Sequence, residues 1–367
     1  MGEWADGGVE RVTYNLLTRL DRERFEPSLV IARRYESGFA LPPDVEVVDL
    51  HAGLVRFALP RLLRHFRRSS PDLLISHMTL PSSWALIARK LLRRSFPIIC
   101  VEHNTLSVEY AYGKGLRRLI PRLLKVTHPW ADALVSVSRA SGDDLTRILG
   151  AHGPPVEVIY NPIVSSDIGP LLDGPPAHPW LEDSRYQVVV AAGRLTFQKN
   201  FGLLVEAFRT VVEGNERARL VILGEGAERE SLERLISRLG LQDVVALPGF
   251  VPNPYPSMSR AAVFVLSSRY EGLPTALVEA MACGTPVITT DTPGGVREIV
   301  GDGRFGLLTP PGDAAALAAA IAAVLAGSPW TREQIRDWAA QFSVEAGARA
   351  YEELVETLLD GRHSRAS

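Results

Sequence analysis

The chain has 367 residues, of which 46% are hydrophobic and 22% are charged, so disorder is excluded as its main state and two domains with substantial cores are possible. Its two cysteines, Cys100 and Cys283, match no metal spacing and are expected to be buried apolar residues in a reducing compartment. No segment resembles a signal peptide, and the longest uncharged apolar run, residues 314–326, is shorter than the roughly 18 residues of a membrane-spanning helix. A cytosolic protein is therefore expected.

The first half of the chain alternates apolar runs with helical patterns. Strands are predicted at residues 28–32, 45–50, 73–76, 98–102 and 133–137. Residues 51–130 carry 14 Lys or Arg against three acidic residues, a net charge of +11. Within them, residues 59–68 interleave cations with apolar side chains and predict a basic amphipathic helix, which fits an anionic membrane surface and a solvated helix face equally well. No recognisable nucleic-acid-binding module accompanies this charge, so nucleic acid is not an expected partner.

The second half repeats strand and helix more regularly. Helices are predicted at residues 201–212 and 228–239, and strands at 187–192, 219–223, 244–247, 263–267, 286–290 and 306–308. A stretch with five prolines, residues 161–184, precedes this half and is interpreted as an interdomain connection. Strands that alternate with helices form a parallel sheet covered on both faces. The sequence thus predicts two α/β domains with a cleft between them, residues 1–165 and 186–343, joined by a linker at 166–185.

Loops that follow strands are where open α/β sheets bind ligands. The loop after the strand at 187–192 carries Arg194 and Lys199, and two cations on one short loop suit a diphosphate. The next loop, Gly224-Glu225-Gly226, resembles half a dinucleotide fingerprint, but Arg229 stands where the third small residue belongs, so a tight turn beside a base pocket is expected. Phe250, after the following strand, is placed near a nucleobase or in a structural turn.

Two glutamates bracket a further loop, Glu271-Gly-Leu-Pro-Thr-Ala-Leu-Val-Glu279. Pro274 suits the first turn of a helix and Thr275 can supply a capping oxygen, so a helix is predicted to begin near Leu273. Glu271 then lies just outside the helix and Glu279 more than a turn inside it. The pair can contact two parts of one extended ligand while free backbone N–H groups face an anion, and a nucleotide-sugar has this character.

These strings occur together in a fixed order. They are Gly193-Arg194 with Lys199-Asn200, Leu223-Gly224-Glu225-Gly226, Leu247-Pro248-Gly249-Phe250, Ser267-Ser268-Arg269-Tyr270-Glu271-Gly272, Glu279-Ala280 and Cys283-Gly284-Thr285-Pro286-Val287. In the first half, Gly7-Gly8-Val9-Glu10-Arg11, Val101-Glu102-His103-Asn104, Ser136-Val137-Ser138 and Tyr160-Asn161-Pro162 join them. The chain resembles the retaining nucleotide-sugar glycosyltransferases of family 4. The resemblance implies the GT-B fold, with two Rossmann-like domains facing a central cleft.

The resemblance assigns roles to individual residues. Arg194 and Lys199 are expected to hold the donor diphosphate and stabilise it as it leaves, and one well-placed donor to developing charge contributes about 3 kcal/mol. Glu271 is expected to contact hydroxyls of the transferred sugar and Glu279 the ribose. His103 is expected to contact the donor sugar or the reacting centre. The other expected binding positions are Gly7, Gly8, Gly193, Gly224, Phe250, Gly272, and the backbone amides near Leu273 and Thr275.

Three neighbouring features complete these expectations. His77, at the end of a strand beside that of His103, fits ligand binding and packing equally well, whereas Ser138 is predicted to cap the helix after its strand. Family members begin with an apolar strand that runs into the glycine loop, but residues 1–6 do not provide it, and this leaves either a start further upstream or a missing strand. The last helix, residues 344–359, is expected to cross back to the first domain, with residues 362–367 as a tail.

The expected activity is transfer of a sugar from a nucleotide-diphosphate sugar, with retention, to a lipid-linked or other glycan intermediate. No Asp-x-Asp sequence is present, so the two cations are expected to serve in place of a metal, and no cofactor is expected. The family is discussed in terms of same-face attack in which the leaving phosphate takes the acceptor proton, and no carboxylate is identified as a nucleophile. The basic first domain favours a lipid-linked acceptor at the inner face of a membrane. An epimerase or hydrolase on the same fold, or a non-catalytic nucleotide-sugar sensor, remain alternatives.

Overall fold

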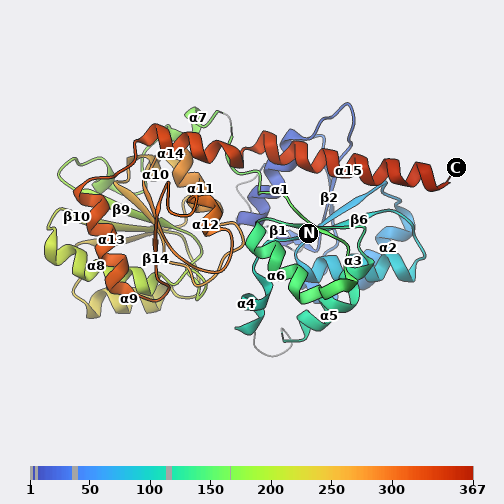
Figure 1. The fold of residues 1–367 in the computed structure, drawn as a ribbon, viewed down its shortest axis with the longest axis horizontal. Helices are drawn as coiled ribbons and strands as arrows, with labels where there is room; N and C mark the ends of the chain where they lie inside the picture. The colour runs from blue at the N-terminus through green and yellow to red at the C-terminus, as the bar shows by residue number, and fades with distance from the viewer. Residues whose placement is uncertain (1–2, 5–6, 35–39, 113–117, 166, 367) are drawn as a thin grey trace. The chain divides into compact units, whose positions relative to one another are not determined.

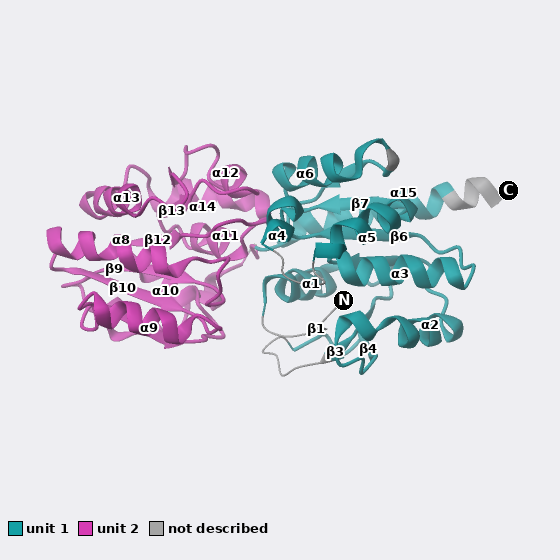
Figure 2. Cartoon of the chain, turned by 90° about the horizontal axis from the view of Figure 1, so that it is seen from below, with its two compact units in different colours: residues 1–163, 344–367 teal, residues 164–343 magenta. Residues whose placement is uncertain are grey.

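The computed structural model describes residues 3–4, 7–34, 40–112, 118–165 and 167–366 (Figure 1). The chain divides into two compact units (Figure 2). Unit 1 comprises residues 1–163 and 344–367, and unit 2 comprises residues 164–343. Among the described residues, no helix is long and apolar enough to cross a membrane.

Unit 1 is built on short parallel strands. They are β1 (Glu3–Trp4), β2 (Ser28–Ile31), β3 (Arg33–Arg34), β4 (Glu46–Asp49), β5 (Leu74–His77), β6 (Ile98–Glu102), β7 (Ala133–Ser136) and β8 (Val156–Val158). The strands β5, β6, β7 and β8 form one parallel sheet in that order, and β2 pairs with β4. Where the sequence predicts no first strand, β1 pairs in parallel with β3 over two residues, with Glu3 opposite Arg33 and Trp4 opposite Arg34.

Helices cover the sheet of unit 1. They are α1 (Gly8–Arg19), α2 (Leu59–Arg68), α3 (Thr79–Leu91), α4 (Leu106–Ala111), α5 (Ile120–Thr127), α6 (Arg139–Leu149) and α15 (Val344–Ala366), with short 3-10 turns η1 (Val55–Phe57), η3 (His128–Trp130) and η4 (Gly150–His152). The C-terminal helix α15 packs against α1, and Glu352 accepts a hydrogen bond from the Asp21 backbone N–H at 2.9 Å. The last helix therefore completes the unit that contains the first residues.

The helix α2 has the basic amphipathic pattern that the sequence predicts, but its apolar face is already covered. Leu62 and Phe66 are buried in the core of unit 1, and Phe66 packs edge-on against Phe96 with ring centroids 5.1 Å apart. Burial of this face stabilises the unit and leaves only the basic side of α2 exposed. The apolar face of this helix is therefore not free to enter a membrane.

Unit 2 contains one six-stranded parallel sheet. Its strands are β9 (Gln187–Ala192), β10 (Ala218–Leu223), β11 (Val245–Gly249), β12 (Val263–Leu266), β13 (Val287–Thr290) and β14 (Leu307–Thr309). They lie in the order β11, β10, β9, β12, β13, β14. The chain thus fills the sheet outward from β9 in one direction and then outward from β12 in the other, which is the doubly wound order with its switch point between β9 and β12.

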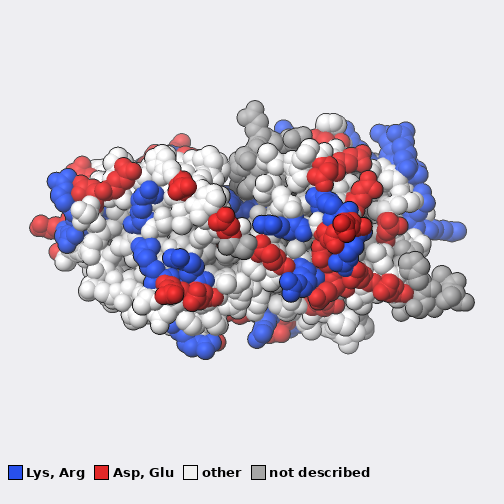
Figure 3. All heavy atoms as spheres, turned by 90° about the horizontal axis from the view of Figure 1, so that it is seen from above, with Lys and Arg blue, Asp and Glu red and all other residues white. Residues whose placement is uncertain are grey.

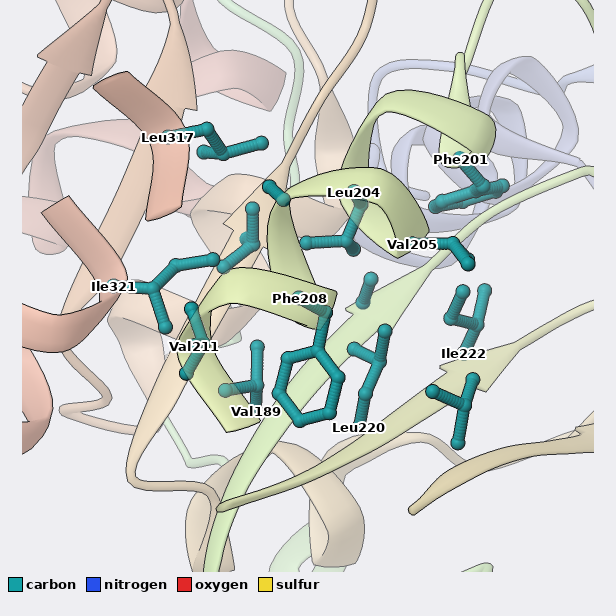
Figure 4. Close-up of a cluster of buried hydrophobic side chains, with 14 of the residues drawn as sticks. Val189, Phe201, Leu204, Val205, Phe208, Val211, Leu220, Ile222, Leu317 and Ile321 are labelled. Carbon is teal, nitrogen blue, oxygen red and sulfur yellow. The ribbon is translucent and has the colours of Figure 1, made fainter. Parts of the chain in front are cut away.

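Helices pack on both faces of this sheet. They are α7 (Gly169–Leu172), α8 (Phe201–Gly214), α9 (Arg229–Arg238), α10 (Tyr255–Arg260), α11 (Thr275–Ala282), α12 (Val296–Ile299), α13 (Ala314–Ala326) and α14 (Arg332–Ala339), with turns η5 (Pro179–Leu181) and η6 (Ala340–Phe342). Figure 4 shows side chains of α8, such as Phe208, between strand residues Val189 and Leu220 and the α13 residues Leu317 and Ile321. Because both sheet faces are covered, the strands read as continuous apolar runs.

The segment predicted as an interdomain linker is described over residues 167–185, which belong to unit 2 and contact its other residues. Ser257 accepts a hydrogen bond from the Ala177 backbone N–H at 2.9 Å, and the Asn253 side-chain amide donates to the Leu171 carbonyl at 2.8 Å. Leu181 is buried. Two hydrogen bonds and the buried Leu181 therefore hold this segment against α10 and the loop before it.

Candidate active site

The site in unit 2 forms at the switch point of the sheet. The strands β9 and β12 are paired neighbours, with Val263 opposite Val189 and Phe264 opposite Val190. The chain leaves them in opposite directions across the sheet, and such a switch point is where open α/β sheets bind ligands. These loops are residues 193–200 and 267–274, which hold Lys199 and Glu271.

The lysine and the glutamate meet directly. Lys199 Nζ lies 2.7 Å from Glu271 Oε1, and Ser268 Oγ donates to the same oxygen at 2.6 Å. The Glu271 residue is 5% exposed and the Lys199 side chain 17%. Removing either member of such a pair leaves an uncompensated charge with little access to water. The sequence placed both residues at the site but did not identify their contact or the role of Ser268.

Gln198 is a further residue that sequence reasoning missed. Its Nε2 donates to the Tyr270 carbonyl at 3.0 Å and to Glu271 Oε2 at 3.5 Å. The Arg269 backbone N–H donates to the Gln198 carbonyl at 2.8 Å, so the two loops are joined by backbone as well as side chain. Its position one residue before Lys199, on a loop already assigned to phosphate, was the available signal.

A third loop, residues 291–295, fixes the backbone of Glu271. The Glu271 N–H donates to the Pro293 carbonyl at 3.0 Å, and the Gly295 N–H donates to the Gly272 carbonyl at 2.6 Å. Gly294 has a φ of +123°, and a Cβ there would lie 2.0 Å from the Glu271 carbonyl oxygen. Only glycine permits both the backbone conformation and this close approach. The Pro-Gly-Gly string after β13 was the sequence signal for this clasp.

The Gly-x-Gly turn supports the Arg-Lys loop from behind. A Cβ at Gly224 would lie 2.0 Å from the Gly193 carbonyl oxygen, and one at Gly226 would lie 2.4 Å from the Leu195 carbonyl oxygen. The Leu195 N–H donates to the Glu225 carbonyl at 2.9 Å. The two glycines therefore let the turn lie against residues 193–195. Gly193 in turn leaves room for Lys199, whose Cε would be 3.2 Å from a Cβ at that position.

The helix after Glu271 begins later than predicted. α11 starts at Thr275, and Pro274 is its N-cap residue with φ −67° and ψ +110°, so Pro274 is not within the first turn. Thr275 lies inside the helix and cannot cap it, and no side chain caps α11. Its first N–H groups carry the positive end of the helix dipole. Leu273, immediately before the cap, is 4% exposed.

Glu279 lies one turn into α11 and is 4% exposed. It is four residues after Thr275, so both project from the same face of the helix. Burial, together with the negative charge of Glu279, raises the pKa of the Cys283 thiol to about 12. Cys283 and Cys100 are both buried free thiols, as the sequence predicts.

Arg194 and Phe250 lie at the surface of unit 2. Arg194 is exposed, and Phe250 is 50% exposed after the end of β11. Lys199 contacts Glu271, and residues 291–295 bond to the backbone of Glu271 and Gly272. Arg194 and Phe250 instead project from neighbouring loops toward solvent. An exposed guanidinium and an exposed ring are available to phosphate and to a flat ring respectively.

In unit 1, two histidines meet at the carboxyl ends of neighbouring strands. His77 Nδ1 lies 2.8 Å from His103 Nε2, and the rings stack with centroids 5.1 Å apart. Burial lowers the pKa of His103 to about 4, and burial together with the His103 ring lowers the pKa of His77 well below its usual value. Both imidazoles are therefore neutral near pH 7 and share one proton between the facing nitrogens.

The backbone beside this pair is strained. Met78, which follows His77, has φ +73° and ψ +149°, a conformation that a non-glycine residue rarely adopts. Its N–H donates to the Val101 carbonyl at 2.8 Å. Such strain persists only where the surroundings impose it, and it concentrates at functional sites.

A buried polar network imposes that geometry. Thr79 Oγ1 donates to Glu102 Oε2 at 2.8 Å, His128 Nε2 lies 2.9 Å from Glu102 Oε1, and the Tyr110 hydroxyl donates to Thr79 Oγ1 at 2.9 Å. Thr79 directly follows Met78, and Glu102 directly precedes His103. The network therefore fixes the ends of both strands. Sequence reasoning missed His128, which lies far from the motifs in the chain.

Two further predictions for unit 1 can be compared with the structure. Ser138 caps α6 by accepting a hydrogen bond from the Ser141 N–H at 3.2 Å, as predicted. Gly7 is the N-cap residue of α1 and Gly8 its first residue. A Cβ at Gly7 would lie 2.4 Å from Glu10 Oε2, the mobile end of a side chain. Among the described residues, no group of three His, Cys, Asp or Glu is placed to hold a metal ion.

The chain matches two family models. Residues 178–342 match glycosyl transferases group 1, and residues 6–166 match glycosyltransferase family 4. A 4-α-N-acetylgalactosaminyltransferase of Campylobacter jejuni, named for its diphospho-undecaprenol-linked substrate, is 30% identical over 318 residues, which cover 82% of this chain and 82% of that protein. An amylovoran biosynthesis glycosyltransferase of Erwinia amylovora is 27% identical over 304 residues, covering 82% and 81%.

Solved structures show the same fold. The Anabaena protein HepE, crystallised with UDP, has a TM-score of 0.76 and 22% identity, with 97% of this chain and 99% of that chain covered. A sucrose-phosphate synthase of Thermosynechococcus elongatus has a TM-score of 0.78 and 23% identity, covering 96% and 93%. The fold is GT-B, as predicted. The chain belongs to the family 4 glycosyltransferases, and its activity is glycosyl transfer.

Proposed function

We propose that the protein transfers a sugar from a nucleotide-diphosphate sugar, with retention of configuration, to a lipid-linked or other glycan acceptor in polysaccharide or glycoconjugate biosynthesis. The observation that carries this proposal is the Lys199–Glu271 pair at the switch point of unit 2, with Ser268 on the same carboxylate oxygen. It combines a cation for phosphate with an acceptor for sugar hydroxyls on two rigidly joined loops.

Departure of the nucleoside diphosphate is the step that needs positive charge. Lys199 supplies a charge of limited exposure, and Arg194 supplies an exposed fork on the same loop. The uncapped start of α11 adds the positive end of a helix dipole. These fixed groups stabilise the charge that develops on the leaving phosphate. One well-aimed donor to such a charge contributes about 3 kcal/mol.

Glu271 binds the sugar in this proposal and does not attack it. Its Oε1 already accepts from Lys199 and Ser268, which reduces its nucleophilicity, while Oε2 has a longer contact of 3.5 Å with Gln198. A carboxylate held this way accepts hydrogen bonds from sugar hydroxyls. The acceptor then attacks from the face of the leaving group and gives its proton to the departing phosphate. Glu279 binds the ribose of the donor.

His103 contributes a neutral hydrogen-bonding nitrogen. Its low pKa keeps it uncharged, so it binds a hydroxyl of the donor sugar without attracting the diphosphate. The cations replace a metal in balancing the diphosphate, so a chelator is expected to leave the activity intact. Loss of activity in EDTA that Mg²⁺ restores would contradict this part of the proposal.

Names of related proteins support the choice of ligands. The Anabaena protein has been crystallised with UDP and with UDP-glucose, and the Campylobacter protein is named for a diphospho-undecaprenol substrate. For this chain we infer a nucleotide-sugar donor and a lipid-linked acceptor reached from the cytoplasmic face of a membrane. We infer that the basic unit 1 makes the peripheral contact with that membrane.

The test is incubation of the full chain with a panel of nucleotide-sugars and with lipid-linked and soluble acceptors. Free nucleoside diphosphate and glycosylated product are measured by mass, and the anomeric configuration of the product by NMR. Transfer with retention supports the proposal. Release of diphosphate without product would indicate a hydrolase, an altered donor sugar an epimerase, and binding without turnover a sensor. Each of these results would overturn it.

A further inference from the structure

Two buried histidines of unit 1 come from the ends of neighbouring strands. His77 is the last residue of β5 and pairs with Val101 of β6, and His103 lies two residues beyond Val101. Side chains two residues apart along a strand project from the same face of the sheet. This register therefore places the two imidazoles side by side, with His77 Nδ1 2.8 Å from His103 Nε2.

The backbone on both sides of the pair holds this arrangement. Met78 follows His77 at a φ of +73°, and its N–H donates to the Val101 carbonyl at 2.8 Å. Thr79, the next residue, donates from Oγ1 to Glu102 Oε2 at 2.8 Å. The segment after one histidine is thus bonded to the segment before the other. Neither strand end can turn its imidazole away without breaking a buried hydrogen bond.

A further buried histidine, His128, has a different environment. Its Nε2 lies 2.9 Å from Glu102 Oε1 and its Nδ1 lies 3.3 Å from Thr127 Oγ1, so both ring nitrogens are engaged within the fold. Among the described residues, His77 Nε2 and His103 Nδ1 have no hydrogen-bond partner. Polar groups of buried residues are normally bonded. Each paired histidine therefore keeps one nitrogen for water or a ligand, whereas His128 is structural.

The shared proton makes the tautomers of the two histidines depend on each other. Burial lowers the pKa of both imidazoles, so each ring carries a single proton near pH 7. If His103 is protonated on Nε2, this N–H donates to His77 Nδ1, and the proton of His77 is then on its own Nε2. The reverse arrangement places both protons on Nδ1. The choice decides whether His103 Nδ1 accepts or donates a hydrogen bond.

The chemistry of imidazole favours protonation on Nε2. The Nε2–H form is the more stable tautomer of a neutral histidine side chain in water. Both rings have this form when His103 donates to His77, whereas the reverse arrangement requires two rings in the less stable form. His103 Nδ1 is then an acceptor, to which a hydroxyl group can donate.

The pair is neutral in a molecule whose surface is rich in charge. Figure 3 shows Lys and Arg interspersed with Asp and Glu on the face that it draws. His77 is 4% exposed and His103 is 7% exposed, so neither imidazole belongs to this charged surface. A neutral acceptor can hold a sugar hydroxyl and has no net attraction for a diphosphate.

We propose that His77 is a positioning residue for glycosyl transfer. It accepts the Nε2–H of His103 and so fixes His103 as the tautomer whose Nδ1 accepts a hydrogen bond from a hydroxyl of the donor sugar. The inference rests on the proposed function for the identity of this ligand. The tautomer itself is a property of the free protein, and His77 acts only through His103.

NMR spectroscopy of the isotope-labelled full chain, without a donor, tests the tautomer. Couplings between the ring protons and ring nitrogens distinguish Nε2–H from Nδ1–H, and His103→Asn identifies the His103 signals. The wild type should show His103 protonated on Nε2. In His77→Leu the Nε2–H would be buried without an acceptor, so His103 should shift toward Nδ1–H. His77→Asn provides an amide oxygen near the position of Nδ1 and should keep His103 protonated on Nε2.

Steady-state kinetics with the donor identified by the panel test the consequence for the sugar. His77→Leu should raise the KM of the donor about fivefold, the effect of one neutral hydrogen bond. It should leave the inhibition constant of the free nucleoside diphosphate unchanged, because that ligand has no transferred sugar. His77→Asn should restore most of the loss. His65→Leu is the matched control, because His65 is a partly buried histidine of α2 bonded to Ser69 at 3.2 Å, and it should change neither constant.

Two results would overturn the inference. One is a wild-type His103 protonated on Nδ1, or a His103 tautomer that His77→Leu leaves unchanged. The other is an equal rise in the donor KM and in the inhibition constant of the nucleoside diphosphate, which would make His77 a structural residue. Melting temperatures establish that the variants fold. Failure of transfer with every donor would count against the proposed function, and the spectra of the wild type and His77→Asn would still decide the role of His77.

Discussion

The strand ends of the two units carry opposite kinds of chemistry. In unit 2, the loops after β9 and β12 hold a lysine, a glutamate and an exposed arginine. In unit 1, the ends of β5 and β6 hold two neutral, stacked histidines braced by a buried carboxylate network. The difference teaches that one parallel sheet architecture can present either fixed charge or neutral hydrogen bonding at the same structural position. Charge suits a leaving diphosphate, and neutral groups suit a sugar.

The largest expected effect tests the charged side of this comparison. Lys199→Ala and Glu271→Ala should each lower kcat/KM by about a hundredfold or more, because each removes a group proposed to bind the donor and leaves its partner's charge uncompensated. The measurement is steady-state kinetics with the donor identified by the panel. Arg209→Ala, on the exposed surface of α8, is the control and should retain activity. Near-normal turnover in both site variants would remove the basis of the assignment.

A second test asks whether the close approach of residues 291–295 to the Glu271 backbone is needed for stability and activity. Gly294→Ala should destabilise unit 2 by about 1 to 3 kcal/mol and reduce kcat/KM, since alanine meets the Glu271 carbonyl at a positive φ. Gly327→Ala is a matched control, because nothing lies within 4 Å of a Cβ there. Denaturant unfolding and kinetics measure the two effects. Equal behaviour of both variants would contradict the role of residues 291–295.

A third test concerns the neutral side. The folded pKa of His103 is lowered from 6.5 to about 4, so the unfolded chain takes up the proton first as pH falls. Stability should therefore be highest above pH 6.5 and should decline between pH 6.5 and about 4, by about 3 kcal/mol for this residue. Denaturant unfolding across this range measures the decline. His103→Asn should remove the part of the decline that His103 contributes and leave the part that comes from the lowered pKa of His77, while substitution of the exposed His51 by Asn should change neither.

The smallest expected effect concerns a helix that supports unit 1. Ser138→Ala should lower stability by about 1 kcal/mol, because it removes the N-cap acceptor of α6. Ser138→Thr keeps the oxygen and should lose less. Thermal unfolding compares the two. If Ser138→Ala instead abolished transfer while stability was retained, Ser138 would be a ligand-binding residue.

Much of unit 2 could be predicted from the sequence because its signals are local. Continuous apolar runs mark buried parallel strands, and the loop carrying Arg194 and Lys199 follows one of them directly. The start of α11 was misplaced by two residues, because Pro274 fits both the cap and the first turn of a helix. Residues 167–185 contact Asn253 and Ser257, and composition does not show which residues such a proline-rich segment contacts.

The contacts that give the site its geometry join residues far apart in the chain. Lys199 and Glu271 are brought together by the pairing of β9 with β12, and Gly294 reaches Glu271 from the loop after β13. His77 meets His103 through the pairing of β5 with β6. The residue types at each loop are visible in the sequence. Their partners depend on strand order, which periodicity does not reveal.

The sequence by itself determined the parallel α/β class, the order of the motifs and the side chains available for phosphate and sugar. Hydrophobic periodicity and loop composition carry that information because they act within a few residues. Only the tertiary structure decided that Glu271 is bound by Lys199 and Ser268, that the histidines are buried and neutral, and that the apolar face of α2 is covered. Those properties follow from burial and from distances between strands, which arise only when the sheets assemble.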